Sequence, residues 1–350
     1  MKFATILIPD ISGYTKFLHK TELSHSTHII NELLQVVADT LQPKFTLAEI
    51  EGDALLTYAE GKLSQAEIEE VCTEAFKNFN YFLKIVERDS VCKCGACNNT
   101  SSLKLKFIVH YGKFDEVKIS QFTKLSGLDM IIAHRLMKNT IPSKEYILVT
   151  DSFTIDTASS AFEWQKGKDN YEVLEDIHYQ YALIDHLKKE VLQPETAEDY
   201  SSLFGLAQVM DLEINAPIKR VHTALTDNNE KANFVEGLID VKADSEINRV
   251  GSTHICEFDG DSFDIKTLQN IDEKDLLVYI EKAHSINTGM TMLTYFELKK
   301  TSENATLVSF RALTGDREII PAPYAEIIYD QTKHTLLSLK SYLEKNLICQ

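Results

Sequence analysis

A polar segment divides this chain of 350 residues into two stretches with different hydrophobic patterns. Residues 187–203 contain Pro194 and many polar or charged side chains, and they follow a stretch in which strand and helix patterns alternate. After the segment, strand patterns run in succession and end in one long helix pattern. Because domain boundaries fall in polar, proline-containing linkers, we expect a domain at 1–186, a linker at 187–203 and a second domain at 204–350.

Charge restricts the possible partners. The chain has 36 Lys and Arg against 53 Asp and Glu, a net charge of −17, which argues against non-specific binding to nucleic acid or to an acidic membrane surface. Residues 101–150 are the exception, with eight basic against four acidic side chains. This local excess predicts a site for a small anion.

The sequence contains no sign of a membrane span or of secretion. No run approaches the eighteen apolar residues of a transmembrane helix. The N-terminal residues lack the apolar core and cleavage site of a signal peptide. Six Cys are too few for a disulfide scaffold in a chain of this length. We therefore expect a cytoplasmic protein.

The first stretch alternates strand and helix patterns. Expected strands lie at 2–8, 45–50, 54–58, 105–111, 116–120 and 146–150, and expected helices at about 65–86 and 128–138. The strands at 45–50 and 54–58 are joined through Glu51-Gly52-Asp53, which is typical of a hairpin. This order predicts an α+β sandwich with helices against one mainly antiparallel sheet.

The second stretch predicts a sheet that packs around one helix. A strand is expected at 209–214, a short helix opens at Ala216-Pro217, and five or six strands follow between 238 and 314. A helix is expected from about 323 to 347 with one apolar stripe, formed by Ile327, Ile328, Leu336, Leu339, Tyr342, Leu343 and Leu347. We expect an antiparallel sheet that grips this C-terminal helix.

Two aspartates in the first stretch are candidate metal ligands. Asp10 ends a core strand and Asp53 lies at a hairpin tip, so the two carboxylates can approach if their strands are neighbours. Paired carboxylates bind hard divalent cations. The helix that starts within Ser12-Gly13-Tyr14-Thr15 has free N–H groups that suit phosphate oxygens. Alternatively, Asp10 caps a helix and Asp53 forms a turn.

Further segments in the same order resemble the class III nucleotide cyclase catalytic domain, which has a ferredoxin-like sandwich. The resemblance covers about residues 1–186. It is carried by Ile8-Pro9-Asp10-Ile11-Ser12-Gly13-Tyr14-Thr15, Glu51-Gly52-Asp53, Val109-His110-Tyr111-Gly112, Gly127 through Leu136, and Lys166-Gly167. A Cys-x-Cys-x-x-Cys insert makes the chain more similar still to an uncharacterised bacterial branch of that superfamily, a domain of unknown function.

The resemblance implies a role for each matching residue. Asp10, Asp53 and the main-chain carbonyl of Ile11 would hold two Mg²⁺ or Mn²⁺, and Arg135 would stabilise the transition state from the other chain of a head-to-tail homodimer. Ser12, Gly13, Tyr14, Thr15 and Lys166 would contact the polyphosphate. Glu49 and Lys124 would select the base, and this pair complements guanine. The substrate would then be a nucleoside triphosphate and the product a cyclic nucleotide.

Two features leave that function open. Ile131 stands where the family has an Asn that contacts the substrate, and loss of such a contact typically costs 10²–10³ in rate. The domain is therefore either a working cyclase or a degenerate fold that senses nucleotide or forms a dimer. Glu49 and Lys124 either contact the base or pair with each other and close the pocket.

Cys92, Cys94 and Cys97 form a cluster too tight for two independent disulfides. Zinc prefers four ligands, so a structural Zn²⁺ site would need a fourth ligand from Cys72, His110 or the partner chain. The alternatives are reduced loop cysteines or a redox sensor.

The second domain resembles the polyketide cyclase/START superfamily (SRPBCC), whose helix-grip fold is that of the birch-pollen allergen. The matching segments are Leu212 through His222 and Val250 through His254. Members commonly enclose an apolar cavity for lipids or other hydrophobic small molecules; the alternative is a filled core. The resemblance implies a ligand-binding module that tunes the first domain.

Overall fold

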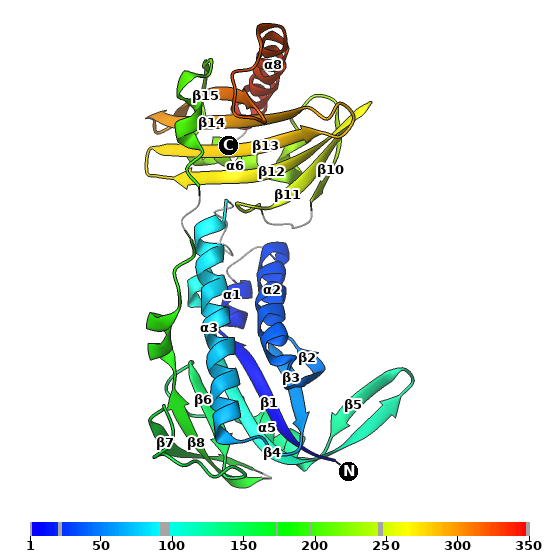
Figure 1. Cartoon of the computed structure of the whole chain (residues 1–350), viewed down its shortest axis with the longest axis vertical. Helices are drawn as coiled ribbons and strands as arrows, with labels where there is room; N and C mark the ends of the chain where they lie inside the picture. Colours follow the sequence, from blue (N-terminus) through cyan, green and yellow to red (C-terminus); the bar gives the residue numbers. More distant parts are fainter. Residues whose placement is uncertain are drawn as a thin grey trace. The chain divides into compact units, whose positions relative to one another are not determined.

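The computed structural model describes residues 2–19, 23–91, 99–172, 174–195, 198–243 and 248–347. The chain forms two compact units, each with helices and strands (Figure 1). The first unit comprises residues 1–87 and 94–194, and the second comprises 88–93 and 195–350. The change of unit after Pro194 falls inside the polar segment 187–203, whose two ends form the short 3₁₀ helices Asp185–Glu190 and Ser201–Leu206.

The first unit is built on an eight-stranded sheet. Its main elements are β1 (Lys2–Ser12), α1 (Tyr14–His19), α2 (Leu23–Leu41), β2 (Thr46–Glu51), β3 (Ala54–Glu60), α3 (Gln65–Asp89), β4 (Lys104–Ile119), β5 (Phe122–Ser126), α5 (Leu128–Leu136), β6 (Tyr146–Thr150), β7 (Trp164–Tyr171) and β8 (Glu175–Leu183). The strand order is β2-β3-β1-β4-β6-β8-β7, with β5 paired to β4 off this path. Among the described ladders only β4 with β6 is parallel. The mixed α+β class expected from the sequence is confirmed.

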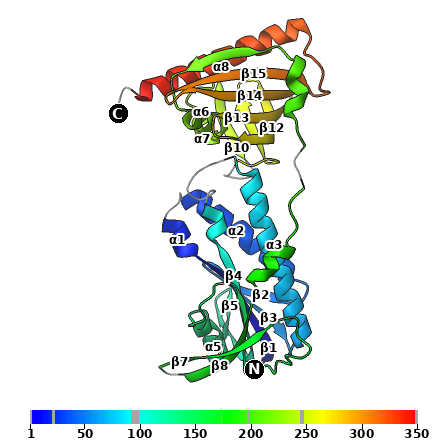
Figure 2. The same cartoon turned by 90° about the vertical axis from the view of Figure 1, so that its left-hand side faces the viewer.

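The helices of the first unit lie on both faces of the sheet. Figures 1 and 2 show α2 and α3 along one face and α5 on the other. Side chains alternate along β1, so Ile6 and Ile8 join the cluster that contains Met130 and Ala133 of α5, whereas Leu7 points to the opposite face. The sheet is therefore buried on both sides, which explains why β1 is apolar at nearly every position.

One expectation for the first unit is wrong. The sequence predicts separate strands at 105–111 and 116–120, but β4 is one strand of sixteen residues. Its ladder with β1 runs without interruption from Ser12 opposite Lys104 to Lys2 opposite Phe114. Gly112 lies within this ladder and makes room for a side chain of α5, because a Cβ there would lie 2.3 Å from Asp129 Cγ.

The second unit is built on a seven-stranded antiparallel sheet. Its main elements are β9 (Met210–Ile214), α6 (Ile218–Thr226), α7 (Asn228–Lys231), β10 (Leu238–Ala243), β11 (Thr253–Phe258), β12 (Asp261–Asp272), β13 (Leu276–Ser285), β14 (Thr291–Ser302), β15 (Ala305–Thr314) and α8 (Ala322–Leu347). The strand order is β10-β11-β12-β13-β14-β15-β9. The expected strands between 238 and 314 and the expected final helix are confirmed.

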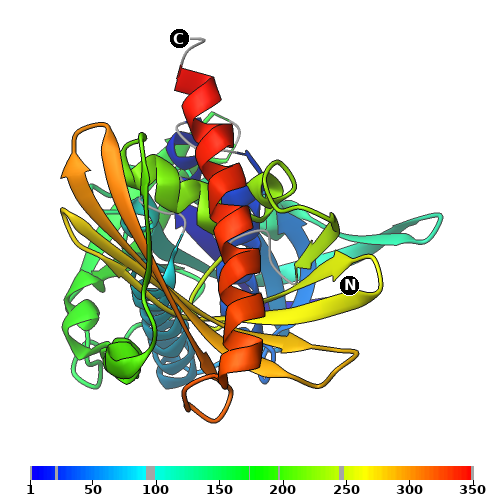
Figure 3. The ribbon, with the colours of Figure 1, turned by 90° about the horizontal axis from the view of Figure 1, so that it is seen from above.

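The long helix α8 provides the second layer of this unit. Figure 3 shows α8 lying across the strands of the sheet. The predicted apolar stripe packs inward, because Leu336, Leu339 and Leu343 share a buried cluster with Val308 and Phe310 of β15. Ile327 of this stripe instead has 56% of its surface exposed.

Candidate functional site

The strand pairing of the first unit brings Asp10 and Asp53 together. Asp10 of β1 lies opposite Ala54, the first residue of β3, and the Ile11 N–H donates to the Asp53 carbonyl oxygen at 2.9 Å. Gly52 has a φ of 64°, which allows the tight turn that presents Asp53. Burial raises the pKa of both carboxyl groups, and the charge of Asp10 raises the pKa of Asp53 further. The two acids therefore form one electrostatic centre that favours a cation.

A lysine that the sequence analysis missed lies at this centre. Lys106 is opposite Asp10 in the ladder of β1 with β4, and its Nζ is 3.3 Å from Asp10 Oδ2. The same Nζ donates to the Met137 carbonyl oxygen at 2.8 Å. Only 8% of the Lys106 side chain and 14% of the Asp10 side chain are exposed. The ammonium lowers the pKa of Asp10, against the larger effect of burial.

The donor set therefore fits one divalent cation. Two carboxylates and a main-chain carbonyl are hard oxygen ligands of the kind that Mg²⁺ and Mn²⁺ prefer. Within the described part of the chain, no group of three or more His, Cys, Asp or Glu side chains could hold a metal ion. A second cation would have to share Asp10 with the Lys106 ammonium.

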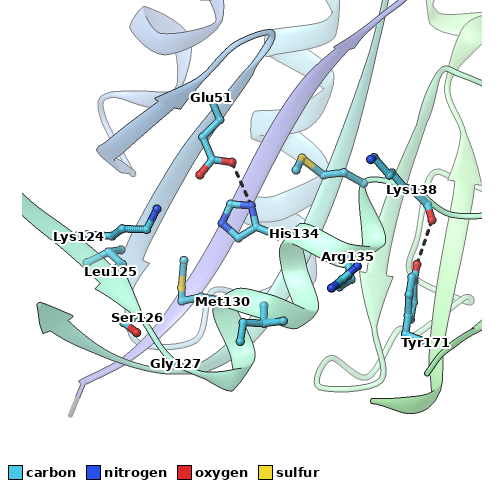
Figure 4. A pocket seen from close by; sticks show the side chains of 12 residues that line it. Glu51, Lys124, Leu125, Ser126, Gly127, Met130, His134, Arg135, Lys138 and Tyr171 are labelled. Atoms are coloured by element: carbon cyan, nitrogen blue, oxygen red, sulfur yellow. Dashed lines mark hydrogen bonds and ion pairs between the residues drawn. The ribbon is translucent and has the colours of Figure 1, made fainter. Parts of the chain in front are cut away.

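A cavity of about 710 Å³ runs along α5, from Gly127 before the helix to Lys138 after it. Its walls come from β2, the end of β5, α5 and β7 (Figure 4). The residues that line it are Glu51, Lys124, Leu125, Ser126, Gly127, Met130, Ile131, His134, Arg135, Met137, Lys138 and Tyr171. Three cations, Lys124, Arg135 and Lys138, face this space together with one acid, Glu51, so the cavity carries the positive charge expected for an anion site.

The two residues expected to select the base are paired with each other. Lys124 Nζ lies 3.2 Å from Glu49 Oε2, the second of the two arrangements that the sequence allowed. The lysine is 67% exposed, so the pair is solvated and breaks at small cost.

Glu51 and His134 form a second contact that sequence reasoning missed. Glu51 Oε2 lies 3.0 Å from His134 Nδ1, and Figure 4 shows the two side chains meeting across the cavity. Burial raises the pKa of Glu51, and the His134 ring lowers it in part. This contact joins α5 to the hairpin that carries Asp53.

Arg135 and Ile131 both lie on the cavity side of α5. Arg135 is exposed and lines the cavity, as the expected role requires. Ile131 is 50% exposed and presents an apolar side chain where a polar contact to substrate was expected. Tyr171 donates to the Lys138 carbonyl oxygen at 3.2 Å, and burial raises the pKa of Tyr171 to about 12.

A partly buried polar network fixes α5, and with it Arg135. Asp129 in the first turn of α5 accepts from the Lys113 N–H at 2.7 Å and contacts His110 Nε2 at 3.1 Å. His110 Nδ1 contacts Thr150 Oγ1 at 2.7 Å. Burial lowers the pKa of His110, so the ring is a neutral structural member of this network.

The other expected site residues lie elsewhere. Ser12 is the last residue of β1, and Gly13 separates it from α1. Tyr14 and Thr15 are the first two residues of α1, a short helix of six residues. Lys166 is exposed on β7 and does not line the cavity.

The expected zinc cluster at Cys92, Cys94 and Cys97 lies outside the described residues. Of the suggested fourth ligands, Cys72 is fully buried in α3, which raises its thiol pKa. His110 is engaged by Thr150 and Asp129. That either side chain completes a zinc site with the Cys cluster stays a prediction.

Comparison with known proteins gives a partial match. Residues 30–146, about a third of the chain, match the family described as Protein of unknown function (DUF2652). Uncharacterized protein Rv2561/Rv2562 of Mycobacterium tuberculosis is 31% identical over 120 residues, which are 34% of this chain. The chain spans 56% of the length of that relative.

Two of the similar solved structures are cyclases. The guanylate cyclase domain of RhGC from Catenaria anguillulae in complex with GTP is 14% identical in sequence, with a TM-score of 0.39. The match covers 52% of this chain and 96% of the cyclase chain. The adenylyl cyclase CyaB from P. aeruginosa is 14% identical in sequence, with a TM-score of 0.38. That match covers 53% of this chain and 94% of the CyaB chain.

Among the described residues, no helix has the length and apolar character needed to cross a membrane.

Proposed function

We propose that residues 1–186 form a class III nucleotide cyclase-like domain that binds a nucleoside triphosphate together with a divalent cation. The observation that carries the proposal is the strand register that places Asp10 beside the Asp53 turn. The cationic cavity lined by Lys124, Arg135 and Lys138 supports it, since a triphosphate needs positive charge beyond the metal.

The residues have distinct roles in this proposal. Asp10, Asp53 and the Ile11 carbonyl would hold Mg²⁺ or Mn²⁺, which would neutralise the polyphosphate and acidify the ribose 3′-hydroxyl. Glu49 would accept from N1–H and N2–H₂ of guanine, and Lys124 would donate to O6 once the two side chains part. Lys166 and the Ser12-Gly13-Tyr14-Thr15 segment are the remaining candidates for phosphate contacts.

The reaction that such a site supports is cyclisation. The 3′-oxygen would attack the α-phosphorus as its proton passes to water, and the bond to pyrophosphate would break. In a head-to-tail homodimer, the partner subunit's Arg135 would stabilise the charge that grows on the α-phosphate oxygens. The Asp129 network would hold that guanidinium in place by fixing α5.

A second candidate function is a nucleotide sensor or dimerisation scaffold without catalysis. Two observations favour it: Lys106 already neutralises part of the charge of Asp10, and Ile131 offers no polar atom to the substrate. In this version the site binds nucleotide but turns it over slowly or not at all.

For residues 204–350 we propose a helix-grip domain of the polyketide cyclase/START type that binds a hydrophobic small molecule. The seven-stranded antiparallel sheet with α8 packed against it supports this assignment. Occupancy of this domain would tune the dimer and so the nucleotide site. Cytoplasmic location and a zinc ion at the Cys cluster stay predictions.

The test is incubation of the purified protein with Mn²⁺ and ATP, GTP, UTP or CTP separately, with cyclic product and pyrophosphate measured by mass spectrometry. A cyclic product that is lost in Asp10→Ala establishes an enzyme and its base preference. Metal-dependent nucleotide binding without product establishes the sensor. The absence of both nucleotide binding and cyclic product would overturn the proposal.

A further inference from the structure

The second unit contains a cavity of about 600 Å³, a volume in the range of small-molecule sites. It lies between the sheet, the segment from α6 to the residues after α7, and α8. The lining residues are Leu225, Lys231, Phe234, Val235, Glu236, Cys256, Phe258, Phe263, Ile265, Glu281, Ala283, Phe296, Gln331, His334 and Thr335.

The walls of this cavity are apolar and rich in aromatic rings. Phe234, Phe258, Phe263 and Phe296 contribute four rings. On the sheet side, Phe263 is opposite Cys256 and Ile265 is two residues along the same face, so one face of β11 and β12 forms a continuous wall. The polar residues Glu236, Gln331 and His334 are exposed and form the mouth.

The polar groups inside are concentrated at one place. Lys231 at the end of α7 is 8% exposed and Glu281 of β13 is 9% exposed, yet both line the cavity. Lys231 Nζ contacts His254 Nε2 at 2.9 Å and Glu281 Oε1 at 3.7 Å. The Tyr279 hydroxyl donates to the same Glu281 Oε1 at 2.6 Å.

These contacts leave at least one donor and one acceptor to spare. An ammonium has three N–H donors; among the described contacts, Lys231 Nζ is within hydrogen-bond distance of His254 Nε2, and the Glu281 contact at 3.7 Å is an ion pair. Both described contacts of Glu281 fall on Oε1, which leaves Oε2 as an acceptor. A lysine and a glutamate held together in an apolar cavity therefore offer N–H and carboxylate oxygen side by side.

The charges at this place sum to zero. Burial, with the charge of Lys231, lowers the pKa of His254 to about 4, so the ring is neutral at pH 7. Lys231 and Glu281 then cancel each other. An additional full charge that a bound ligand buried beside this pair would lack a counter-charge, and burial of an unpaired charge costs several kcal/mol.

We propose that this cavity binds an uncharged, mainly apolar or aromatic small molecule through one hydroxyl group, which accepts from Lys231 and donates to Glu281. The inference rests on the proposed ligand-binding function of the second unit and adds the chemistry of the ligand. A hydroxyl satisfies both spare groups at once, whereas a hydrocarbon leaves both unpaired.

The test uses four probes that share one ring system and differ in the head group: 1-naphthol, naphthalene, 1-naphthoate and 1-naphthylmethylamine, the last cationic at pH 7. Binding to the full-length protein is measured by calorimetry. We expect 1-naphthol to bind about tenfold more tightly than each of the other three, the gain from one satisfied polar pair. Ala283→Phe, which fills the cavity, should abolish binding of all four.

Two variants isolate the polar pair. Lys231→Met with Glu281→Gln removes both charges together, so no unpaired charge is left buried; it should bring 1-naphthol within about twofold of naphthalene. Glu281→Gln alone keeps an acceptor for Tyr279 but leaves Lys231 uncompensated, so 1-naphthoate should gain about tenfold.

The outcomes separate this inference from the function on which it rests. Equal affinity for the four probes, or tightest binding of a charged probe by the unaltered protein, overturns the hydroxyl inference and leaves the apolar pocket standing. No binding of any probe overturns both.

Discussion

Lys106 Nζ lies 3.3 Å from Asp10 Oδ2, directly across the ladder of β1 with β4. The carboxylate of Asp10, which was expected to bind only a metal ion, is thus already paired with a cation of the chain itself. The pair lowers the net negative charge of the Asp10–Asp53 centre by one, and the fixed carbonyl contact to Met137 keeps the ammonium in place. In the proposed function, the balance between lysine and metal at this point would decide how strongly the site binds a divalent ion.

Replacement of Lys106 should strengthen metal binding. Lys106→Met removes a positive charge beside Asp10, so the dissociation constant for Mn²⁺ in the presence of GTP should fall about tenfold. Lys106→Arg keeps the charge and serves as the control. The measurement is titration calorimetry on both variants. Equal Mn²⁺ affinity in Lys106→Met and the unaltered protein would show that the ammonium does not compete with the metal.

Ile131→Asn should increase cyclic nucleotide formation. It supplies a polar side chain at the cavity wall, and such contacts are typically worth 10²–10³ in rate, so we expect a gain of at least about tenfold. Because Ile131 is half exposed, stability should change by less than about 0.5 kcal/mol. Ile131→Ala is the matched control without the amide. A rate that rises equally in both variants, or in neither, contradicts the assigned role of this position.

Asp53→Asn should stabilise the first unit at pH 7. Burial and the neighbouring Asp10 raise the pKa of Asp53, so the folded state disfavours its charged form. Such an acid contributes stability while protonated and loses it as the pH rises from the unfolded pKa through the folded one. Because the Asp53 side chain is only partly buried and solvent screens its charge, we expect a gain of no more than about 1 kcal/mol at pH 7 that disappears near pH 4.

Thermal or urea unfolding of Asp53→Asn across this pH range is the check. The exposed Asp151→Asn serves as the control and should show no such difference. A stabilisation that persists at pH 4 would mean that the charge of Asp53 is not its cause.

Gly112→Ala should weaken the docking of α5. The new Cβ would lie 2.3 Å from Asp129 Cγ, which forces the carboxylate out of its contacts with His110 and the Lys113 N–H. Overpacking of this kind costs about 1–3 kcal/mol, seen as a lower midpoint in urea unfolding. Gly205→Ala, where nothing lies within 4 Å, is the control and should change little. Equal effects of the two substitutions would contradict the packing argument.

The sequence predicts Asp10 and Asp53 because each lies at the end of an apolar strand pattern, where turn and strand chemistry are readable from neighbouring residues. It does not predict that Lys106 meets Asp10, because that contact depends on which strand pairs with β1 and in which register. A lysine inside the apolar run from Leu105 to Val109 was the available signal, since a buried lysine requires a partner.

The contact between Glu51 and His134 had no such signal. It joins a hairpin to a helix more than eighty residues later, and neither residue interrupts a local pattern. The full length of strand β4 was missed for a different reason. Its residues pair with β1 as far as Phe114 and with β5 from Asp115 onward, so one continuous strand serves two partners that local patterns do not reveal.

The most direct test of the central claim is calorimetric titration of GTP into the protein with and without Mn²⁺, repeated for Asp53→Asn and for Asp10→Asn. The account predicts GTP binding that requires Mn²⁺ and weakens at least about tenfold in each variant, since each loses one of two carboxylate ligands. GTP binding that is independent of Mn²⁺ and unchanged in both variants would contradict it.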